Sequence, residues 1–320
     1  MKILITGCAG FIGSHLTEYF LNNGHTVVGV DNFDAFYSKD LKLQNIAIAS
    51  KHNNFVFHEL DIRNSIGFAT LSKDIEAVVH LAAKAGVRPS IEDPLGYGET
   101  NIKGTLNLLE WMRDAKVNKM IFASSSSVYG NNKKIPFSET DSVDQPISPY
   151  AFTKKSCELL NYTYHKLYNF DIINLRFFTV YGPRQRPDLA IRKFIENIQA
   201  GTPIHLFGDG NTARDYTFIS DIVNGIGSAL KYTDKHTNLY EIVNLGNNNP
   251  IKLIDMVMSI YTILGKEPNI IYESMQPGDV DITYADITKA SKLFNYNPST
   301  SFEDGIKKFV GWILTSNNQR

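Results

Sequence analysis

The sequence predicts an α/β protein that combines a Rossmann-type doubly wound parallel sheet with a smaller C-terminal α/β domain. Two observations predict the sheet. Over the first 175 residues, short β-branched runs alternate with longer segments whose apolar residues recur at helical spacing, as expected when helices connect parallel strands. A glycine-rich turn follows the first of these runs, and such turns bind phosphate groups in this fold class.

The apolar runs that we interpret as buried strands are short and rich in Ile and Val. They cover residues 2–6, 26–30, 54–58, 76–80, 119–123 and 171–175. Helical spacing lies between them, over residues 11–23, 40–50, 98–114 and 150–168. This arrangement gathers the carboxyl ends of the strands at one edge of the sheet, where open α/β sheets bind their ligands.

The composition changes after residue 178, where proline and glycine become frequent. Helical patterns continue over residues 188–199, 219–232, 251–264 and 302–313. The apolar run at 240–246 is expected to return to the first sheet. We therefore assign residues 1–177 and 215–246 to the Rossmann domain, and residues 178–214 and 247–320 to a smaller, loop-rich domain.

The composition also excludes several classes of protein. A net charge of -1 provides no electrostatic footprint for nucleic acid or an anionic membrane. No stretch approaches the roughly 20 apolar residues of a membrane span, and the start "MKILITG" lacks the apolar segment of a signal peptide. Cys8 and Cys157 form neither a disulfide framework nor a metal-ligand pattern. A cytoplasmic protein without a bound metal is therefore expected.

The glycine turn has the spacing of a dinucleotide site. Gly7, Gly10 and Gly13 follow the first strand and open a helix, so that backbone N–H groups and the positive helix end can meet a pyrophosphate. Asp31 ends the second strand, about 20 residues further on. Its carboxylate can accept both ribose hydroxyls and would repel a 2′-phosphate, which favours NAD over NADP. The alternative role of Asp31 is a strand-end cap.

Further residues at the strand ends extend the expected cofactor site. Asp61 and Ile62 follow the third strand, where an acid can meet the adenine amino group and an isoleucine can pack on the ring. Ala82 and Ala83 follow the fourth strand and leave room for the cofactor. The full set expected to contact NAD is Gly7, Gly10, Phe11, Ile12, Gly13, Asp31, Asn32, Asp61, Ile62, Leu81, Ala82, Ala83, Lys84, Asn101, Tyr150 and Lys154.

Tyr150 and Lys154 are four residues apart at the start of a predicted helix, and therefore lie on one face of it. A free phenol has a pKa of about 10. A nearby ammonium, together with a positive nicotinamide ring, would stabilise the phenolate and make Tyr150 a general base. Many surface helices contain such a pair by chance. Ser125, at the end of the fifth predicted strand, strengthens the interpretation because it can share a substrate hydroxyl's proton with Tyr150.

These motifs together resemble the extended short-chain dehydrogenase/reductase family, specifically its nucleotide-sugar epimerases and dehydratases. The resemblance covers essentially the whole chain and rests on "TGCAGFIGSHL", "DIR", "HLAAKAGVRPSIEDP", "SSSSVYG", "SPYAFTK" and "GDGNTARDYTFISDIV". It implies a Rossmann fold, a tightly held NAD and a catalytic group that falls on Ser125, Tyr150 and Lys154. Asn101 matches the family asparagine that steadies the active-site helix and the cofactor.

The serine row at 124–127 distinguishes among the reactions of the family. Dehydratases of this family carry an Asp-Glu pair just before V-Y-G, and sugar-acid decarboxylases carry a glutamate there. This chain has Ser126 and Ser127 at those places. Proton abstraction at C5 then lacks its base, whereas hydride removal and return at C4 remain possible. The resemblance therefore implies epimerisation at C4 through a transient 4-keto sugar.

The resemblance also implies how the diphosphate and the nucleoside bind. Arg214 matches the family arginine on the pyrophosphate, and Asp279 matches a contact to the substrate ribose. Galactose-type epimerases have a second phosphate arginine where this chain has Gln276. Arg88 is our candidate to replace that arginine.

The segment "RFFTVYGPRQRPDLA" and the later "MQPGDV" look like those of UDP-glucuronate 4-epimerases. We assign Arg186, Thr179 and Ser126 to the sugar carboxylate, because arginine offers that group a bidentate fork. The alternative is a loop whose arginines are solvated or bind the phosphates.

The expected reaction is thus the NAD-dependent conversion of UDP-glucuronate to UDP-galacturonate, with the smaller domain binding the nucleotide sugar. The alternative is a 4-epimerase of UDP-glucose or of a UDP-N-acetylhexosamine. A non-catalytic NAD-binding protein, a dehydratase, a decarboxylase and a reductase are further alternatives. The helical segments at 98–114 and 150–168 resemble those that the family pairs into a four-helix interface, so the resemblance implies a homodimer.

Overall fold

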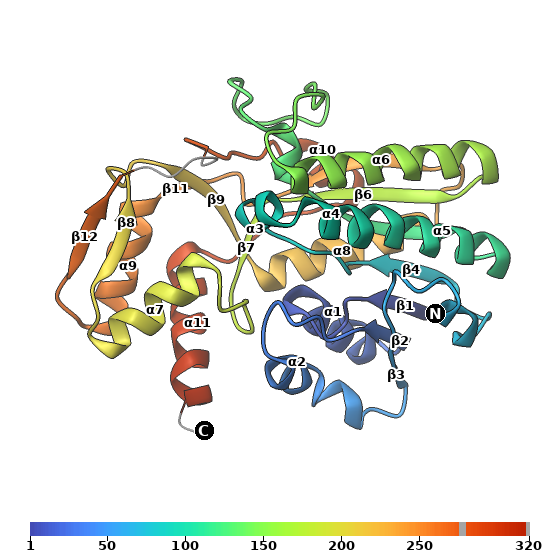
Figure 1. Ribbon diagram of the computed structural model, residues 1–320, viewed down its shortest axis with the longest axis horizontal. Coiled ribbons are helices and arrows are strands. Elements are labelled where there is room, and N and C mark those ends of the chain that lie inside the picture. Colours follow the sequence, from blue (N-terminus) through green and yellow to red (C-terminus); the bar gives the residue numbers. More distant parts are fainter. Residues whose placement is uncertain (275–279, 318–320) are drawn as a thin grey trace.

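The computed structural model describes residues 1–274 and 280–317. Its centre is a seven-stranded sheet with the order β10-β6-β5-β4-β1-β2-β3, in which all neighbouring strands are parallel (Figure 1). The strands are β1 (Lys2–Thr6), β2 (Thr26–Asp31), β3 (Phe55–Glu59), β4 (Ala77–His80), β5 (Lys119–Ser125), β6 (Asp171–Phe177) and β10 (Tyr240–Leu245). The predicted Rossmann-type sheet is confirmed, including the return of β10 to its edge beside β6.

Helices cover both faces of this sheet, because the strands carry apolar side chains on both faces and each face must be buried. Ile3 and Ile5 of β1 pack in one core with helices α1 and α8, whereas Leu4 packs on the other face with α5 and α6 (Figure 1). These helices are α1 (Phe11–Asn22), α5 (Gly104–Ala115), α6 (Pro149–Tyr168) and α8 (Ile219–Thr233). The four segments agree closely with the predicted helical patterns, apart from the start of the 98–114 segment.

The start of that segment is not a regular α-helix. Residues Gly98–Lys103 form a π-helical turn, η3, that runs directly into α5. Such turns are rare and are frequent at functional sites. Two short helices that the sequence analysis did not identify precede it, α3 (Val87–Glu92) and α4 (Pro94–Tyr97). The Rossmann part further contains α2 (Lys39–Ile46) and the 3₁₀ turns η1 (Ala49–Lys51), η2 (Gly67–Thr70) and η4 (Ser126–Tyr129).

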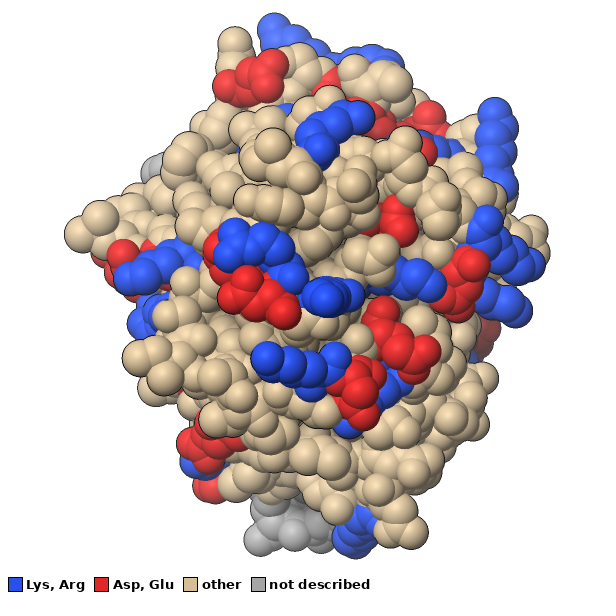
Figure 2. Space-filling model, turned by 90° about the vertical axis from the view of Figure 1, so that its right-hand side faces the viewer, with Lys and Arg blue, Asp and Glu red and all other residues tan. Residues whose placement is uncertain are grey.

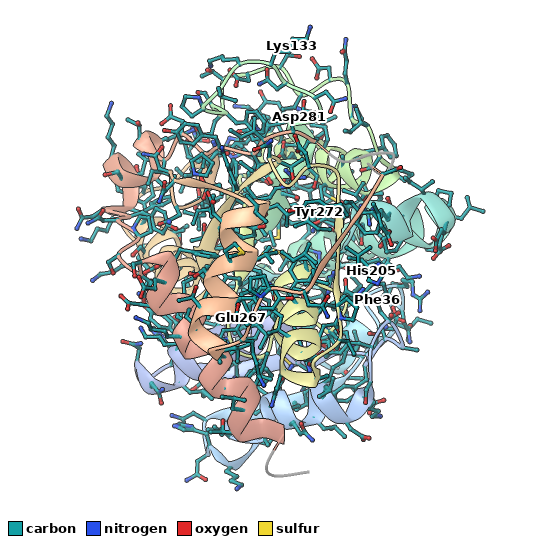
Figure 3. All side chains as sticks on the ribbon, turned by 90° about the vertical axis from the view of Figure 1, so that its left-hand side faces the viewer. Phe36, Lys133, His205, Glu267, Tyr272 and Asp281 are labelled. Atoms are coloured by element: carbon teal, nitrogen blue, oxygen red, sulfur yellow. The ribbon has the colours of Figure 1, made fainter. Side chains whose placement is uncertain are left out.

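Most of the remaining elements form a smaller assembly beside the sheet, seen face on in Figure 3 with His205 and Tyr272 labelled. One sheet has the order β11-β9-β7 and a second pairs β12 with β8. Their bounds are β7 (Thr179–Tyr181), β8 (Ile204–Phe207), β9 (Ala213–Phe218), β11 (Pro250–Lys252) and β12 (Ile270–Glu273). The helices of this assembly are α7 (Ala190–Ala200), α9 (Leu253–Leu264) and α11 (Phe302–Asn317), whereas α10 (Thr288–Phe294) packs against α8 and β10 of the large sheet. The exact domain boundaries stay a prediction.

The start of α6 shows how the sequence fixes a helix end that matters for the site. Ser148 is the N-cap residue, and its hydroxyl accepts a hydrogen bond from the N–H of Ala151 at 3.1 Å. Pro149 occupies the first turn, where its missing N–H has no consequence. Tyr150 is therefore held in the first turn of a long and well-capped helix.

Charged side chains are mixed over the surface. On the face shown in Figure 2, basic and acidic groups lie beside one another, and no large area of one sign stands out. This distribution agrees with the net charge of -1. In the ranges that the structure describes, no helix is both long enough and apolar enough to cross a membrane.

His80 at the end of β4 should make stability depend on pH. It is buried between the Thr6 hydroxyl, 2.6 Å from Nδ1, and the Thr105 hydroxyl, 3.0 Å from Nε2. Burial, with the nearby charge of Lys154, lowers its pKa to about 3. An unfolded histidine titrates near pH 6.5, so below that pH the unfolded chain binds the extra proton and stability falls.

We predict that the free energy of unfolding decreases by about 2 kcal/mol more between pH 6.5 and pH 5 in the wild type than in His80→Gln. Urea unfolding at a series of pH values measures this difference. Parallel curves for the two proteins would show that His80 does not titrate differently in the folded and unfolded states.

Candidate active site

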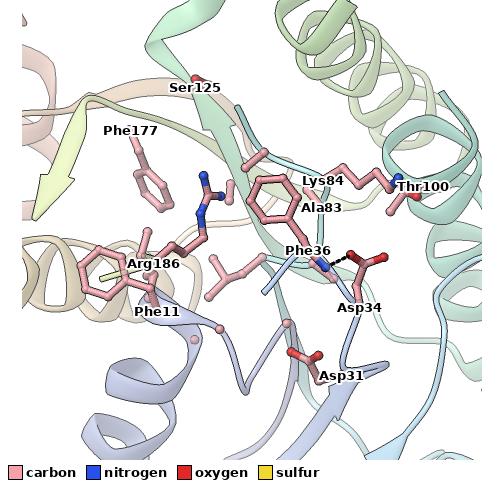
Figure 4. A pocket seen from close by; sticks show the side chains of 18 of the residues that line it. Phe11, Asp31, Asp34, Phe36, Ala83, Lys84, Thr100, Ser125, Phe177 and Arg186 are labelled. Atoms are coloured by element: carbon pink, nitrogen blue, oxygen red, sulfur yellow. Dashed lines mark hydrogen bonds between the residues drawn. The ribbon is translucent and has the colours of Figure 1, made fainter. Parts of the chain in front are cut away.

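A cavity of about 370 Å³ opens at the carboxyl edge of the large sheet, beside the smaller assembly (Figure 4). Its position follows from the strand order, because β1 and β4 are neighbours whose connections leave in opposite directions. The predicted residues on its wall are Gly7, Gly10, Phe11, Ile12, Gly13, Asp31, Asn32, Ile62, Leu81, Ala82, Ala83, Lys84, Ser125, Tyr150, Lys154, Thr179 and Arg186.

The glycine turn between β1 and α1 leaves no room for side chains. Gly7 has a φ of +74°, and a Cβ on Gly13 would lie 2.0 Å from the carbonyl oxygen of Gly7. Helix α1 begins after Gly10 without a side-chain cap and without an acidic residue in its first turn. Its first N–H groups and its positive dipole end are therefore suited to an anion in the cavity.

Asp31 ends β2 beside this turn and is 8% exposed. Its carboxylate accepts hydrogen bonds from the N–H groups of Ala9, at 3.1 Å, and Phe33, at 2.9 Å. Burial raises its pKa, whereas the charge of Lys42 opposes that rise. Asp31 thus does cap its strand end, as the alternative reading expected, yet its side chain also lines the cavity.

Asp61 and Asn101 stand behind the cavity wall. Asp61 accepts from Asn32 at 2.9 Å and pairs with Arg63 at 2.6 Å, and these hydrogen bonds hold its pKa at about 2. Asn101 is buried in the π-helical turn. Its side chain bonds to both backbone groups of Lys84 and donates to the Thr153 hydroxyl on α6 at 3.0 Å. It therefore ties the cavity wall to the helix that carries Tyr150.

Ser125, Tyr150 and Lys154 meet at one end of the cavity. Ser125 is the last residue of β5, and its hydroxyl donates to the Ser127 hydroxyl at 2.9 Å. The same hydroxyl lies near the phenol of Tyr150, and by turning its proton toward that phenol it lowers the pKa of Tyr150. Lys154 is buried on the next turn of α6, and its Nζ donates to the carbonyl of Ala123 at 2.7 Å.

The influences on the pKa of Tyr150 differ from those that the sequence analysis expected. Burial is the largest influence on Tyr150 and raises its pKa, while Ser125 and the charge of Arg186 oppose the rise. Burial also lowers the pKa of Lys154 to about 8. The sequence argument assigned the stabilisation of the phenolate to Lys154 and the cofactor. In this structure the charge of Arg186 lowers the pKa of the phenol, while Nζ of Lys154 donates one hydrogen bond to the carbonyl of Ala123.

Arg186 reaches the cavity from the loop between β7 and α7. It lies between Phe36 and Phe177 in Figure 4, with its guanidinium carbon 5.1 Å from the centre of the Phe36 ring. It also forms an ion pair with Asp188 at 2.8 Å. Thr179 begins β7 and lines the same cavity, so two of the three residues assigned to the sugar carboxylate meet there.

Other predicted substrate residues are not on this wall. Ser126 begins η4 and is half-buried. Arg88 is exposed on α3, with its guanidinium 5.8 Å from the centre of the Phe207 ring. Arg214 lies on β9, where Nη1 donates to the carbonyl of Ala213 at 3.0 Å. Gln276 and Asp279 lie outside the described residues. Substrate contacts by these five residues stay predictions.

The cavity wall also contains residues that the sequence analysis did not select. Several come from the loop after Asp31, whose aromatic run "NFDAFY" was an available signal. Others neighbour predicted residues at strand ends. The additional residues are Val30, Asp34, Phe36, Tyr37, Lys42, Leu60, Ala85, Thr100, Ala123, Ser124, Phe177, Phe178, Val180 and Leu189.

A Rossmann sheet, a glycine turn and a Ser–Tyr–Lys group at one cavity are typical of a dinucleotide-dependent enzyme that acts on an alcohol. Residues 4–309 match the family described as GDP-mannose 4,6 dehydratase, and the chain belongs to this family, within the extended short-chain dehydrogenases/reductases.

Proteins of known activity are similar along the whole chain. A UDP-glucuronate 4-epimerase of Thermodesulfobacterium geofontis is 46% identical over 312 residues, which are 97% of this chain and 95% of that protein. The crystal structure of UDP-glucuronic acid 4-epimerase from Bacillus cereus, in complex with UDP-glucuronic acid and NAD, has a TM-score of 0.93 at 40% identity and covers 99% and 100% of the two chains. A UDP-glucose 4-epimerase from Thermotoga maritima, with UDP-glucose, has a TM-score of 0.90 at 33% identity, with coverage of 99% and 100%.

Proposed function

We propose that this protein is an NAD-dependent 4-epimerase that interconverts UDP-glucuronate and UDP-galacturonate. The observation that carries the proposal is the position of Arg186, which shares one cavity with Ser125, Tyr150 and Lys154. A guanidinium beside the reacting group suits a substrate with a carboxylate next to the carbon that reacts. The similarity to UDP-glucuronate 4-epimerases over the whole chain supports the same substrate.

The cradle at the carboxyl edge fits NAD. The crowded turn at Gly7 and Gly13 accepts a pyrophosphate close to the backbone, and the buried carboxylate of Asp31 suits a ribose with free hydroxyls. Asn32, Ile62 and the small residues after β4 would line the rest of its path. When bound, NAD would accept a hydride from C4 and return it to the opposite face of the ketone.

The residues of the chain move the proton. Tyr150 is the proposed base for the C4 hydroxyl, and Ser125 holds that hydroxyl and the phenol in one hydrogen-bonded group. Burial opposes formation of a phenolate, so positive charge must lower the barrier to proton transfer. Arg186 provides such charge in this structure, and Lys154 lies one helical turn from the phenol.

The distribution of acids favours epimerisation over dehydration. The carboxylates on the described cavity wall are those of Asp31 and Asp34, both in or after β2. They lie at the opposite end of the view in Figure 4 from Ser125. At the serine end, a base that could remove a proton from C5 would have to come from elsewhere. The ketone is therefore returned to an alcohol.

The remaining substrate roles follow the family resemblance. We propose Arg214 and Arg88 as partners of the diphosphate, Asp279 and Gln276 as contacts of the nucleotide, and Ser126 as a further donor to the sugar carboxylate. Both cysteines are free thiols that are buried in the fold, which suits a cytoplasmic enzyme.

We further propose a homodimer formed through α4, α5 and α6. These elements expose large apolar side chains, including Leu95 (83% exposed), Leu159 (57%) and Phe152 (54%). Exposed large apolar side chains on neighbouring helices are typical of an interface, and the resemblance implies that a second copy covers them.

Purified protein is expected to convert UDP-glucuronate faster than UDP-glucose or UDP-N-acetylglucosamine at equal concentration. Arg186→Met should raise KM for UDP-glucuronate about tenfold or more, because it removes the carboxylate's charged partner, and should affect UDP-glucose less. Product separation by ion exchange measures both reactions. Lys193→Met, an exposed site on α7, is the control. Because Arg186 also acts on the phenol, kcat should fall for both sugars, whereas an equal rise of KM for both would argue against carboxylate recognition by Arg186.

Tyr150→Phe should lower kcat by about 10²- to 10⁴-fold, because the general base is lost while the ring remains. Nucleotide released from the denatured variant should still be NAD, in the wild-type amount. Tyr162→Phe tests a half-exposed tyrosine on the same helix and should keep activity. Turnover of the Tyr150 variant at the wild-type rate would overturn the mechanism.

The double variant Phe152→Glu/Leu159→Glu should be monomeric by light scattering, because two buried charges would destabilise an apolar interface. Ile66→Glu changes an equally exposed apolar residue (82%) outside these helices and should leave the dimer intact. A monomeric wild-type protein would contradict the proposed assembly.

A further inference from the structure

We propose that Asp188 is a specificity-determining positioning residue that fixes the guanidinium of Arg186, so that the remaining donors of this arginine bind the carboxylate of the sugar. The inference rests on the proposed function and deepens it. It names the residue that turns a flexible arginine into a receptor for a uronate rather than a neutral hexose.

The backbone around Arg186 is fixed from two sides. Arg184 has a φ of +64°, an unusual conformation for a side chain of this size, and its Nη2 pairs with Glu18 of α1 at 2.7 Å. The buried side-chain amide of Gln185 donates to the backbone carbonyl of Val180 in β7 at 2.9 Å, and the backbone carbonyl of Gln185 accepts from Nη1 of Arg192 in α7 at 2.6 Å. These contacts hold the backbone at Arg186 in place, whereas its long side chain needs a further contact to be fixed.

Asp188 fixes that side chain through two parallel hydrogen bonds. Nε of Arg186 donates to Oδ1 at 3.0 Å, and Nη2 donates to Oδ2 at 2.8 Å. This bidentate geometry allows one orientation of the planar guanidinium, whereas a single contact would leave it free to rotate. The Arg186 side chain is 17% exposed and the Asp188 side chain 36%, so water screens the pair mainly from the side of Asp188.

The geometry leaves an edge for a second carboxylate. A guanidinium carries five N–H donors, and Asp188 uses those of the Nε–Nη2 edge. The Nη1–Nη2 edge has the same fork geometry and suits the carboxylate of a sugar. Arg186 lines the cavity with Tyr150 and Thr179, so an anion on that edge would stand beside the reacting group.

The opposite reading makes Asp188 a competitor that occupies Arg186 until the substrate displaces it. The two readings predict changes of opposite sign. A competitor would weaken substrate binding, so that its removal would tighten binding. A positioning residue would strengthen binding, and its removal would release the guanidinium into many rotamers, whose entropy must then be lost when the substrate binds.

The experiment compares wild type, Asp188→Ala and Asp188→Asn, each loaded with NAD. Calorimetry measures the Kd of UDP-glucuronate and of UDP, which has no sugar carboxylate. Steady-state assays provide KM and kcat. Asp188→Ala should raise Kd and KM for UDP-glucuronate about tenfold, with kcat changed less than KM. The Kd of UDP should change by less than about twofold. The Kd and KM of Asp188→Asn for UDP-glucuronate should lie between those of the wild type and those of Asp188→Ala, because an amide oxygen accepts one of the two hydrogen bonds.

Glu303→Ala is the matched control. It removes the partner of Lys307, which is paired at 2.6 Å on α11 and is not on the cavity wall. This variant should bind both ligands as the wild type does. If Asp188→Ala binds UDP-glucuronate more tightly, or as tightly as the wild type, the proposal is wrong. Equal weakening for UDP would also overturn it, because that result indicates damage to the whole site.

A different experimental result would show that the proposed function itself is wrong. In that case the wild-type protein would not convert UDP-glucuronate, although the binding constants could still be compared among the variants. Wild-type protein that binds UDP-glucuronate no better than UDP-glucose would refute both the carboxylate site and the role of Asp188.

Discussion

The ion pair between Glu158 and Arg176 is the interaction on which the arrangement of the site depends. Both side chains are 1% exposed, and two hydrogen bonds of 2.9 and 2.8 Å join them. Buried charges are costly unless they are paired and hydrogen-bonded, and here Nη1 of Arg176 alone lacks a hydrogen-bond partner among the described residues. Ser124 supplies a further bond by donating to Glu158 at 2.7 Å. The pair therefore links the ends of β5 and β6 to the middle of α6, and those strand ends carry Ser125 and the chain leading to Thr179.

Burial also determines the protonation of the side chains in the cavity. Burial raises the pKa of Tyr150 and lowers that of Lys154, so both side chains are driven toward their neutral forms. With a pKa of about 8, Lys154 still carries most of its charge at pH 7, whereas burial keeps the phenol of Tyr150 neutral and therefore a weak base. The charge of Arg186 lowers the pKa of Tyr150 and partly offsets burial. The loop that we propose to bind the sugar carboxylate is thus also part of the electrostatic surroundings of this phenol.

The sequence was sufficient for the large sheet and the cofactor edge, because the signals there are local. Alternating apolar runs mark the strands, and the spacing of Gly7, Gly10 and Gly13 marks the turn. The short strands β7, β8, β11 and β12 have three or four residues each, too few for a periodic pattern to emerge. The engagement of Lys154 with Ala123 and the ion pair of Arg186 with Asp188 depend on three-dimensional packing, and no spacing in the sequence predicted either of them.

The family to which the chain belongs is described by a dehydratase, yet the cavity favours a different reaction, and the reason lies in a few side chains. In the proposed mechanism, the Rossmann cradle, Tyr150 and Lys154 would create a ketone at C4 in either reaction. What happens next depends on whether a base reaches C5. Serines at 126 and 127 cannot serve as that base at neutral pH, while an arginine held by Asp188 can bind a carboxylate that would otherwise be free to leave as CO₂. The absence of a base and the presence of a held cation act in the same direction, since the first prevents loss of water and the second prevents loss of CO₂ until the hydride returns.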